Sequence, residues 1–175
     1  MENWATEKEF LDLWAVNYQT GEPIPAEIVE RIIAAQNYLA AYLNVRQLSF
    51  GLTDMAWHTI TEPFEGDVEQ FEVASMAPSQ VQPVVPGTAM APAFGHIFSG
   101  GYAAGYYGYK WAEVLEADAF SLFKEKGIFN REVSGSFREN ILSKGGTEHP
   151  MELYVRFRGH KPETKALIEK MGLGK

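Results

Sequence analysis

The sequence predicts a mainly α-helical protein with one long proline-rich loop and one glycine-rich loop. Apolar residues recur three or four positions apart through most of the 175 residues, which is the spacing of side chains on one face of a helix. Sustained alternation of apolar and polar residues, the pattern of a half-buried strand, does not extend beyond a few residues. Glycine, proline and asparagine stand where the periodic segments begin and end.

The first half of the chain predicts three helices and a short fourth. The first ends at Gly21-Glu22-Pro23, and its apolar side chains are Trp4, Leu11, Trp14 and Tyr18. Pro25 begins the second, whose apolar side consists of Ile28, Ile32, Ile33 and Leu39. The third runs from about residue 44 to 59, with the apolar residues Leu48, Leu52, Met55 and Trp57. Residues 68–76 fit a short helix.

A loop separates this half from the next. Between Pro78 and Pro92 the chain holds four prolines, one glycine and no charged residue. A segment of this kind is either a domain boundary or a functional loop inside a compact domain. We expect a functional loop, because the segment with the strongest active-site character follows directly.

The second half predicts a long helix over residues 103–126 with a core face that contains Trp111, Leu115 and Leu122. Gly127 fits the position after a helix C-terminus. Asn130 is expected to cap a helix that reaches Leu142, and Thr147 a helix that reaches Arg158. Pro162 begins the last helix, which Gly172 ends.

Composition excludes several classes of function. The net charge of −8 argues against a nucleic-acid partner, because phosphate binding needs basic patches. The chain has no cysteine, which excludes disulfides, thiol catalysis and cysteine-ligated zinc, and is compatible with the cytoplasm. No apolar run reaches the length of a membrane span, so no membrane partner is expected.

A histidine, a double glycine and a row of tyrosines form the most informative segment. His96 precedes Gly100-Gly101, and Tyr102, Tyr106 and Tyr109 follow at positions i, i+4 and i+7. In a helix these three phenols would share one face. A neutral phenol can donate a hydrogen bond to a developing oxyanion, but an aromatic stripe can equally be packing. Both interpretations, and both a structural and a functional role for His96, remain open from the residues alone.

The other histidines point to no metal site. His58 fits a core or interface position, and His149 and His160 fit surface positions near helix ends. The chain has no His-Glu-x-x-His motif, which would place two imidazoles on one helix face for zinc. We therefore expect no metal ligand among these residues.

Several segments together resemble the C-terminal part of the thimet oligopeptidase and peptidyl-dipeptidase family of zinc metallopeptidases. The similarity runs along most of the chain. Its motifs are Met1-Glu2-Asn3-Trp4, Arg46-Gln47-Leu48-Ser49-Phe50, Phe94-Gly95-His96, Gly100-Gly101-Tyr102-x-Ala104-x-Tyr106-Tyr107-x-Tyr109, Ile141-Leu142-x-x-Gly145-Gly146 and Arg156-Phe157-x-Gly159.

The resemblance implies that residues 1–175 are the C-terminal portion of a helical catalytic domain without its zinc-binding helices. The parent enzyme would use zinc, whose ligands lie upstream, to hydrolyse short peptides in the cytoplasm. This chain would bind no zinc through ligands of its own, would be inactive alone, and would have the missing N-terminal part as its partner. The resemblance leaves open whether the parent removes C-terminal dipeptides or cuts internally.

The resemblance also implies roles for individual residues. His96 would contact the substrate or the tetrahedral intermediate, and Tyr106 and Tyr109 would contact the substrate and stabilise the oxyanion. Tyr102 and the glycines Gly100 and Gly101 would bind substrate through the loop, and Glu2 would lie near the zinc ligands. The alternatives are a non-catalytic peptide-binding helical module and a structural helical domain with packed tyrosines.

Overall fold

A computed structural model describes residues 2–174. Within this range the chain is helical, and the only strand-like pairing is an isolated antiparallel bridge between Val16 and Pro23. The mainly α fold is therefore confirmed. Met1, which opens the first family-like motif, lies outside the described residues. No helix within residues 2–174 has the length and apolar character needed to cross a membrane.

The chain divides into two compact units, each described here by itself. Unit 1 consists of Met1–Tyr38 and Val114–Lys175, and unit 2 of Leu39–Glu113. The elements that lie wholly in unit 1 are η1 (Glu2–Thr6), α1 (Lys8–Leu11), α2 (Ala26–Gln36), α7 (Arg131–Phe137), the π-helical turn η4 (Arg138–Leu142), α8 (Pro150–Arg158) and α9 (Lys165–Lys170). Those of unit 2 are α3 (Ala40–His58), α4 (Val68–Met76), η2 (Ala77–Ser79), η3 (Ala91–Ala93) and α5 (Gly95–Phe98). Helix α6 (Gly108–Lys126) begins in unit 2 and continues in unit 1.

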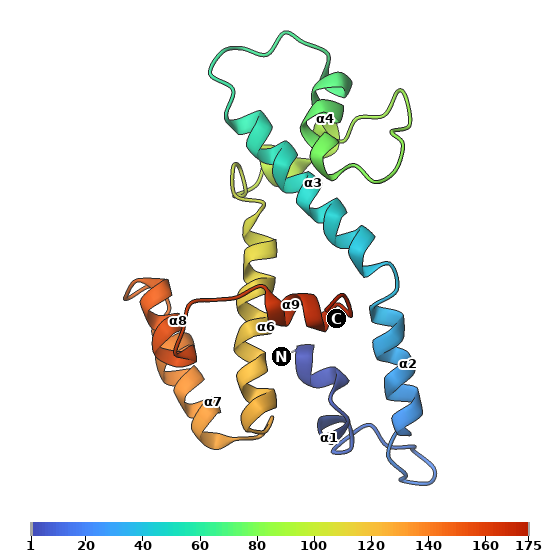
Figure 1. Cartoon of the computed structure of the whole chain (residues 1–175), viewed down its shortest axis with the longest axis vertical. Helices are drawn as coiled ribbons and strands as arrows, with labels where there is room; N and C mark the ends of the chain where they lie inside the picture. The colour runs from blue at the N-terminus through green and yellow to red at the C-terminus, as the bar shows by residue number, and fades with distance from the viewer. Residues whose placement is uncertain (1, 175) are drawn as a thin grey trace. The chain divides into compact units, whose positions relative to one another are not determined.

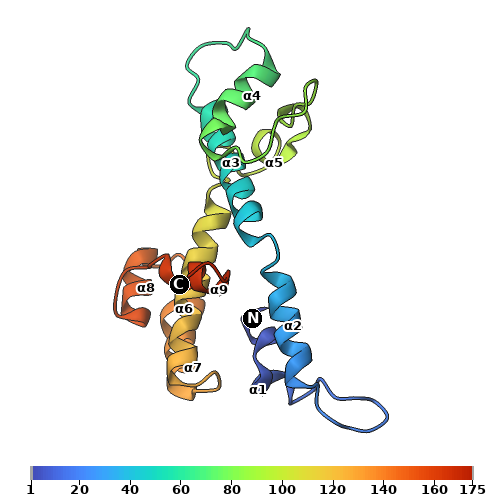
Figure 2. The ribbon, with the colours of Figure 1, turned by 45° about the vertical axis from the view of Figure 1, so that its right-hand side comes forward.

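Aromatic side chains build the core of unit 1. Helices α7 and α8 lie beside the C-terminal half of α6 (Figures 1 and 2). The buried residues of this core are Ala119, Phe120, Phe123, Ile128, Val133, Tyr154 and Phe157. Trp4 packs edge-on against Phe120 at 4.6 Å between ring centroids and donates its indole N–H to the Ile128 carbonyl at 3.1 Å. The N-terminal segment is thereby fixed to the core that α6 builds.

Several helix ends lie where proline, asparagine and glycine in the sequence predict them. Helix α2 begins directly after Pro25, and the Asn130 side chain accepts the N–H groups of Glu132 and Val133 at the start of α7. Gly127 has a left-handed backbone with φ +103°, which a residue with a Cβ atom adopts rarely. The expected helix to Leu142 is present as α7 followed by the π-helical turn η4.

In unit 1, three helix boundaries predicted from the sequence are wrong. The first helix ends at Leu11, and the expected continuation is instead a turn between the bridge residues Val16 and Pro23, in which the Asn17 side chain accepts the N–H groups of Gln19 and Thr20. Tyr18, expected on an apolar helix face, is 91% exposed. Helix α8 starts at Pro150 with His149 as its cap, not at Thr147. The last helix starts at Lys165, three residues beyond Pro162.

Helix α3 buries its small and polar residues. Ser49, Gly51, Thr53 and Asp54 are buried, whereas Leu48, Leu52 and Met55 are 49%, 40% and 40% exposed. The expected helix is present, but three of its four predicted apolar residues, Leu48, Leu52 and Met55, are exposed, and only Trp57 of that set packs within unit 2. Figure 2 shows α4 and α5 near the C-terminal end of α3. Trp57 of α3 contacts Phe71 of α4 at 4.2 Å between ring centroids.

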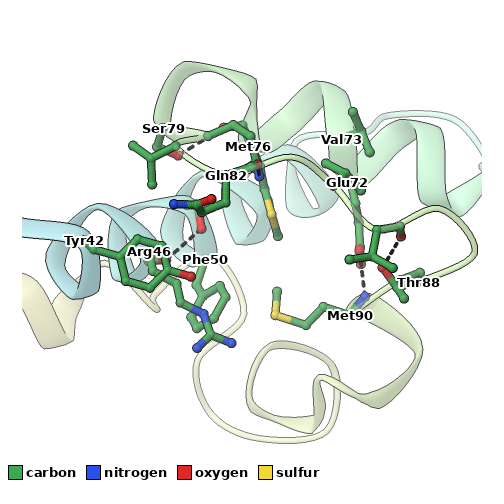
Figure 3. A pocket seen from close by; sticks show the side chains of 16 residues that line it. Tyr42, Arg46, Phe50, Glu72, Val73, Met76, Ser79, Gln82, Thr88 and Met90 are labelled. Carbon is green, nitrogen blue, oxygen red and sulfur yellow. Dashed lines mark hydrogen bonds between the residues drawn. The ribbon is translucent and has the colours of Figure 1, made fainter. Parts of the chain in front are cut away.

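Two carboxylates of α4 hold the end of the proline-rich loop. Glu72 is buried and accepts the backbone N–H groups of Met90, at 2.7 Å, and of Ala91. Glu69 accepts the N–H of Gly87 at 2.9 Å. Figure 3 shows Glu72 directed at Met90, with Arg46 and Phe50 of α3 across the same pocket. The loop therefore lies within unit 2 and is held at its C-terminal end, and its functional role stays a prediction.

Candidate functional site

The glycine–tyrosine segment forms a turn rather than the first part of a helix. Residues 101–107, called here the tyrosine turn, precede α6, which begins at Gly108. The predicted helix start near residue 103 is therefore wrong. Trp111, predicted on the core face of that helix, is 46% exposed, whereas Leu115 and Leu122 pack against the unit 1 core.

The turn nevertheless brings the predicted site residues together. The Tyr109 ring lies 4.8 Å from Tyr102, 5.3 Å from Tyr106 and 6.3 Å from His96, measured between centroids. His96 also lies 5.9 Å from Tyr102 and 6.2 Å from Tyr106. These four residues are called the aromatic cluster. Tyr102 and Tyr109 are each 40% exposed and His96 is exposed, so the cluster is open to a ligand on unit 2.

The phenols of Tyr106 and Tyr109 have raised pKa values and stay protonated at neutral pH. Hydrogen bonding to Tyr102 is the largest cause that raises the pKa of Tyr109 to about 12, followed by partial burial and the nearby charges of Tyr102 and Tyr106. Burial also raises the pKa of Tyr106, against the opposing charge of Arg46. A neutral phenol retains its O–H and can donate a hydrogen bond to a developing negative charge.

Helix α3 contributes two partners of the turn that the sequence analysis did not single out as site residues. The Tyr106 hydroxyl donates to Oε1 of Gln47 at 2.8 Å. Asp54 accepts the backbone N–H groups of Ala104 and Tyr106 at 2.9 and 2.8 Å. The available signal was an acidic residue inside a predicted helix, because a carboxylate that becomes buried needs hydrogen-bond partners.

The two glycines differ in their surroundings. A Cβ atom at Gly100 would lie 3.0 Å from the backbone oxygen of His96, closer than side chains normally approach. A Cβ atom at Gly101 would meet nothing within 4 Å. The absence of a side chain at Gly100 therefore lets the backbone of this residue approach the backbone of His96 closely. No such close approach involves Gly101.

Two hollows of unit 2 adjoin the cluster. One, of about 390 Å³, is lined by Tyr106 and Tyr109 and by the exposed apolar side of α3 with Leu48, Leu52 and Met55. The other, of about 360 Å³, lies between α3, α4 and the proline-rich loop and is lined by Arg46 and Phe50, among others (Figure 3). The Phe50 ring lies 6.0 Å from the Tyr106 ring and 5.3 Å from the Arg46 guanidinium carbon. Apolar walls beside a few polar groups are typical of ligand sites.

Metal-ligand residues do not gather at this site. In the described part of the chain, no group of three or more His, Asp or Glu side chains is arranged to hold a metal ion. His149 and His160 lie near helix ends in unit 1, and His58 is partly buried against Asp54. Glu2 is an exposed residue of η1 in unit 1. The zinc that the resemblance implies therefore has no ligand set within residues 2–174.

Comparison with known proteins gives matches along nearly the whole chain. The sequence profile of Peptidase family M3 matches residues 1–173. Oligopeptidase A of Escherichia coli (strain K12) is 48% identical over 176 residues, which are 99% of this chain and 26% of that protein. Probable cytosolic oligopeptidase A of Arabidopsis thaliana is 39% identical, over 99% of this chain and 25% of that protein. Dipeptidyl carboxypeptidase of E. coli is 36% identical, over 98% and 26% respectively.

These similarities define a class of peptide-hydrolysing enzymes. The chain belongs to Peptidase family M3, which confirms the family resemblance. It spans about a quarter of the length of the curated relatives that it matches.

Proposed function

We propose that this chain is the C-terminal portion of a zinc peptidase that hydrolyses short peptides in the cytoplasm. Its likeness to oligopeptidases over a quarter of their length supports this proposal, as do the missing zinc-ligand motif and a relative whose name includes the word cytosolic. The zinc ligands would come from the N-terminal part of the same protein. The chain alone is then inactive, and the exposed apolar side of α3 is a surface available to that missing part.

Within such an enzyme, His96, Tyr106 and Tyr109 would act on the scissile peptide. The observation that carries this assignment is the aromatic cluster, in which each of the four rings lies within 6.3 Å of a neighbour and His96, Tyr102 and Tyr109 are exposed. Tyr109 would donate a hydrogen bond to the carbonyl oxygen as it gains negative charge, and Tyr106 would do so after its O–H leaves Gln47. His96 and Tyr102 would contact the substrate, Gly100 and Gly101 would let the loop close over it, and Glu2 would support the zinc ligands.

A whole enzyme that carries this chain tests the proposal. Hydrolysis of short peptides should require the upstream segment, and Tyr109→Phe should lower the rate without changing the metal content. Activity of residues 1–175 alone would contradict the fragment assignment. Full activity of Tyr109→Phe in the whole enzyme would contradict the role of the phenol.

A peptide-binding module without catalysis is the second candidate. The hollow beside Tyr106 and Tyr109 favours it, because its apolar wall suits a peptide side chain. Calorimetric titration of the chain with short peptides in chelator-containing buffer distinguishes the candidates. Peptide binding, together with no peptidase activity in the whole protein, would support this second function.

A further inference from the structure

The middle of α3 carries a carboxylate that solvent does not reach. Asp54 is 0% exposed. Its Oδ1 accepts the N–H of Ala104 at 2.9 Å, and its Oδ2 accepts the N–H of Tyr106 at 2.8 Å. A buried charge is costly unless it is paired or hydrogen-bonded, and here both oxygens are occupied by one short piece of backbone. The partners lie 50 and 52 residues further along the chain.

The backbone that meets Asp54 has an uncommon conformation. Ala104 has φ +52°, in the left-handed region that residues with a Cβ atom rarely adopt. Two nearby N–H groups that converge on one anion form a backbone anion site of the kind called a nest. In this protein the anion is part of the chain. The charge of Asp54 therefore favours the conformation of the tyrosine turn that the local sequence disfavours.

We propose that Asp54 is a positioning residue, which holds the tyrosine turn so that Tyr102, Tyr106 and Tyr109 meet in the aromatic cluster. Tyr106 is tied at two points, by its N–H to Asp54 and by its hydroxyl to Gln47. In the sequence, Tyr102 precedes and Tyr109 follows this doubly hydrogen-bonded residue. The inference rests on the proposed function only where it assigns these tyrosines to the peptidase reaction.

His58 completes the surroundings of the carboxylate. Its Nδ1 lies 2.8 Å from Oδ1 of Asp54, one helical turn earlier, and the His58 ring lies 5.6 Å from Phe98. An N–H at Nδ1 can donate to the backbone carbonyl oxygen of Asp54, at 2.9 Å, while the imidazole stays beside the carboxylate. Asparagine at position 54 would keep the shape of the side chain but present an NH₂ group to one of the two backbone donors, and so lose at least one hydrogen bond.

Amide hydrogen exchange of the 175-residue chain, followed by NMR, tests the inference. In Asp54→Asn the amides of Ala104 and Tyr106 should exchange about tenfold faster or more, relative to interior amides of α3. The matched control is Thr53→Val, because Thr53 is also 0% exposed and its hydroxyl donates only within α3, to Ser49 at 2.9 Å. This control should leave the relative protection of the two amides unchanged.

A second variant tests the backbone part of the inference. Glycine adopts positive φ without the Cβ penalty, so Ala104→Gly added to Asp54→Asn should restore part of the lost protection. Unchanged relative protection of both amides in Asp54→Asn would overturn the inference. If that variant fails to fold, the wild-type chain decides: exchange of Ala104 and Tyr106 as fast as that of the exposed Ala103 would overturn it, and clear protection would support it.

The whole enzyme separates this inference from the proposed function. Lost protection with a reduced turnover number and a nearly unchanged KM in Asp54→Asn supports both. Lost protection with full turnover supports the positioning role of Asp54 and contradicts a catalytic role of the tyrosines. Retained protection contradicts the positioning role whatever the turnover.

Discussion

The rings of Tyr102 and Tyr109 lie 4.8 Å apart although the first belongs to a turn and the second to helix α6. The sequence predicts their proximity from their spacing of seven residues, which places side chains on one face of a helix. In the structure the tyrosine turn produces it instead. The contact between Tyr102 and Tyr109 therefore depends on the conformation of the tyrosine turn, and the pKa of Tyr109 can be used to detect a change in that conformation.

The first prediction concerns that titration. Tyr109 should ionise with a pKa of about 12, and Tyr102→Phe should lower this value towards the ordinary value of about 10, because the phenol interaction is lost. Tyr107→Phe, in the same turn, is the control and should change it little. Carbon-13 NMR of the tyrosine ring carbons measures the pKa.

The sign of the accompanying stability change follows from the raised pKa. Between about pH 10 and pH 12 the folded chain keeps a proton on Tyr109 that the unfolded chain loses. The contribution of the Tyr109 phenol to the free energy of unfolding is complete below about pH 10 and is lost as the pH rises through 12. A Tyr109 pKa near 10 in the wild-type chain would contradict the interaction.

Kinetics of the whole enzyme provide the second prediction. Tyr109→Phe should lower kcat by about 10²-fold with little change in KM, because the phenol acts on charge that develops in the transition state. Tyr106→Phe should cost less, because the Tyr106 hydroxyl already donates to Gln47, and His96→Ala should affect both constants. Equal losses from Tyr109→Phe and the control Tyr107→Phe would indicate a packing role.

The glycine pair gives a third prediction with a built-in control. Gly100→Ala should reduce turnover, because its Cβ would lie 3.0 Å from the His96 carbonyl oxygen and displace that residue. Gly101→Ala should have a smaller effect, because its Cβ would enter open space. Turnover and zinc content of the whole enzyme are the measurements. A larger loss from Gly101→Ala would mean that flexibility, rather than close approach, is the requirement.

A fourth prediction concerns the exposed side of α3. Leu48, Leu52 and Met55 lie at i, i+4 and i+7 and are 49%, 40% and 40% exposed. Contiguous apolar surface favours association, so the chain alone should self-associate or bind an apolar dye. Leu48→Gln with Leu52→Gln should reduce this, whereas Leu142→Gln, at an exposed residue of unit 1, should not. Sedimentation and dye fluorescence measure the effect, and a monomer without dye binding would contradict it.

The fifth prediction tests the core of unit 1. The buried Tyr154 hydroxyl donates to Asp118 at 2.6 Å, and burial together with this contact raises the Tyr154 pKa. Tyr154→Phe removes a donor from a buried carboxylate and should lower the free energy of unfolding by about 1–3 kcal/mol. Tyr38→Phe, at an exposed position, should change it by much less. Denaturant unfolding measures both.

Local chemistry explains which parts of the fold could be predicted. Asn130 and Gly127 act within their own turn of chain, so the helix ends that they define follow from the sequence. The start of α6 does not, because the preceding turn is held by Asp54, 50 residues away. The spacing of apolar residues predicts which side of a single helix is buried. It does not predict a contact between residues that are 50 positions apart.

The candidate site was predicted more fully than the turn that builds it. His96, Tyr106 and Tyr109 stood out through their residue types and the adjacent glycines, and the structure brings their rings together. Their roles in catalysis stay predictions. Asp54 and Gln47 were missed as site residues because each lies in the third predicted helix, where only the apolar residues were used to define a face.

In α3 the buried residues are small or polar and several apolar residues are exposed. This pattern should determine which substitutions the helix tolerates. A library of variants selected only for folding of the 175-residue chain should accept polar residues at Leu48 and Leu52, and reject most changes at Thr53 and Asp54, whose side chains are sealed from solvent. A library selected for activity of the whole enzyme should accept few substitutions at all four positions, because Leu48 and Leu52 would then pack against the rest of the enzyme. The difference between the two libraries would map the positions that the rest of the enzyme covers, without a structure of that enzyme.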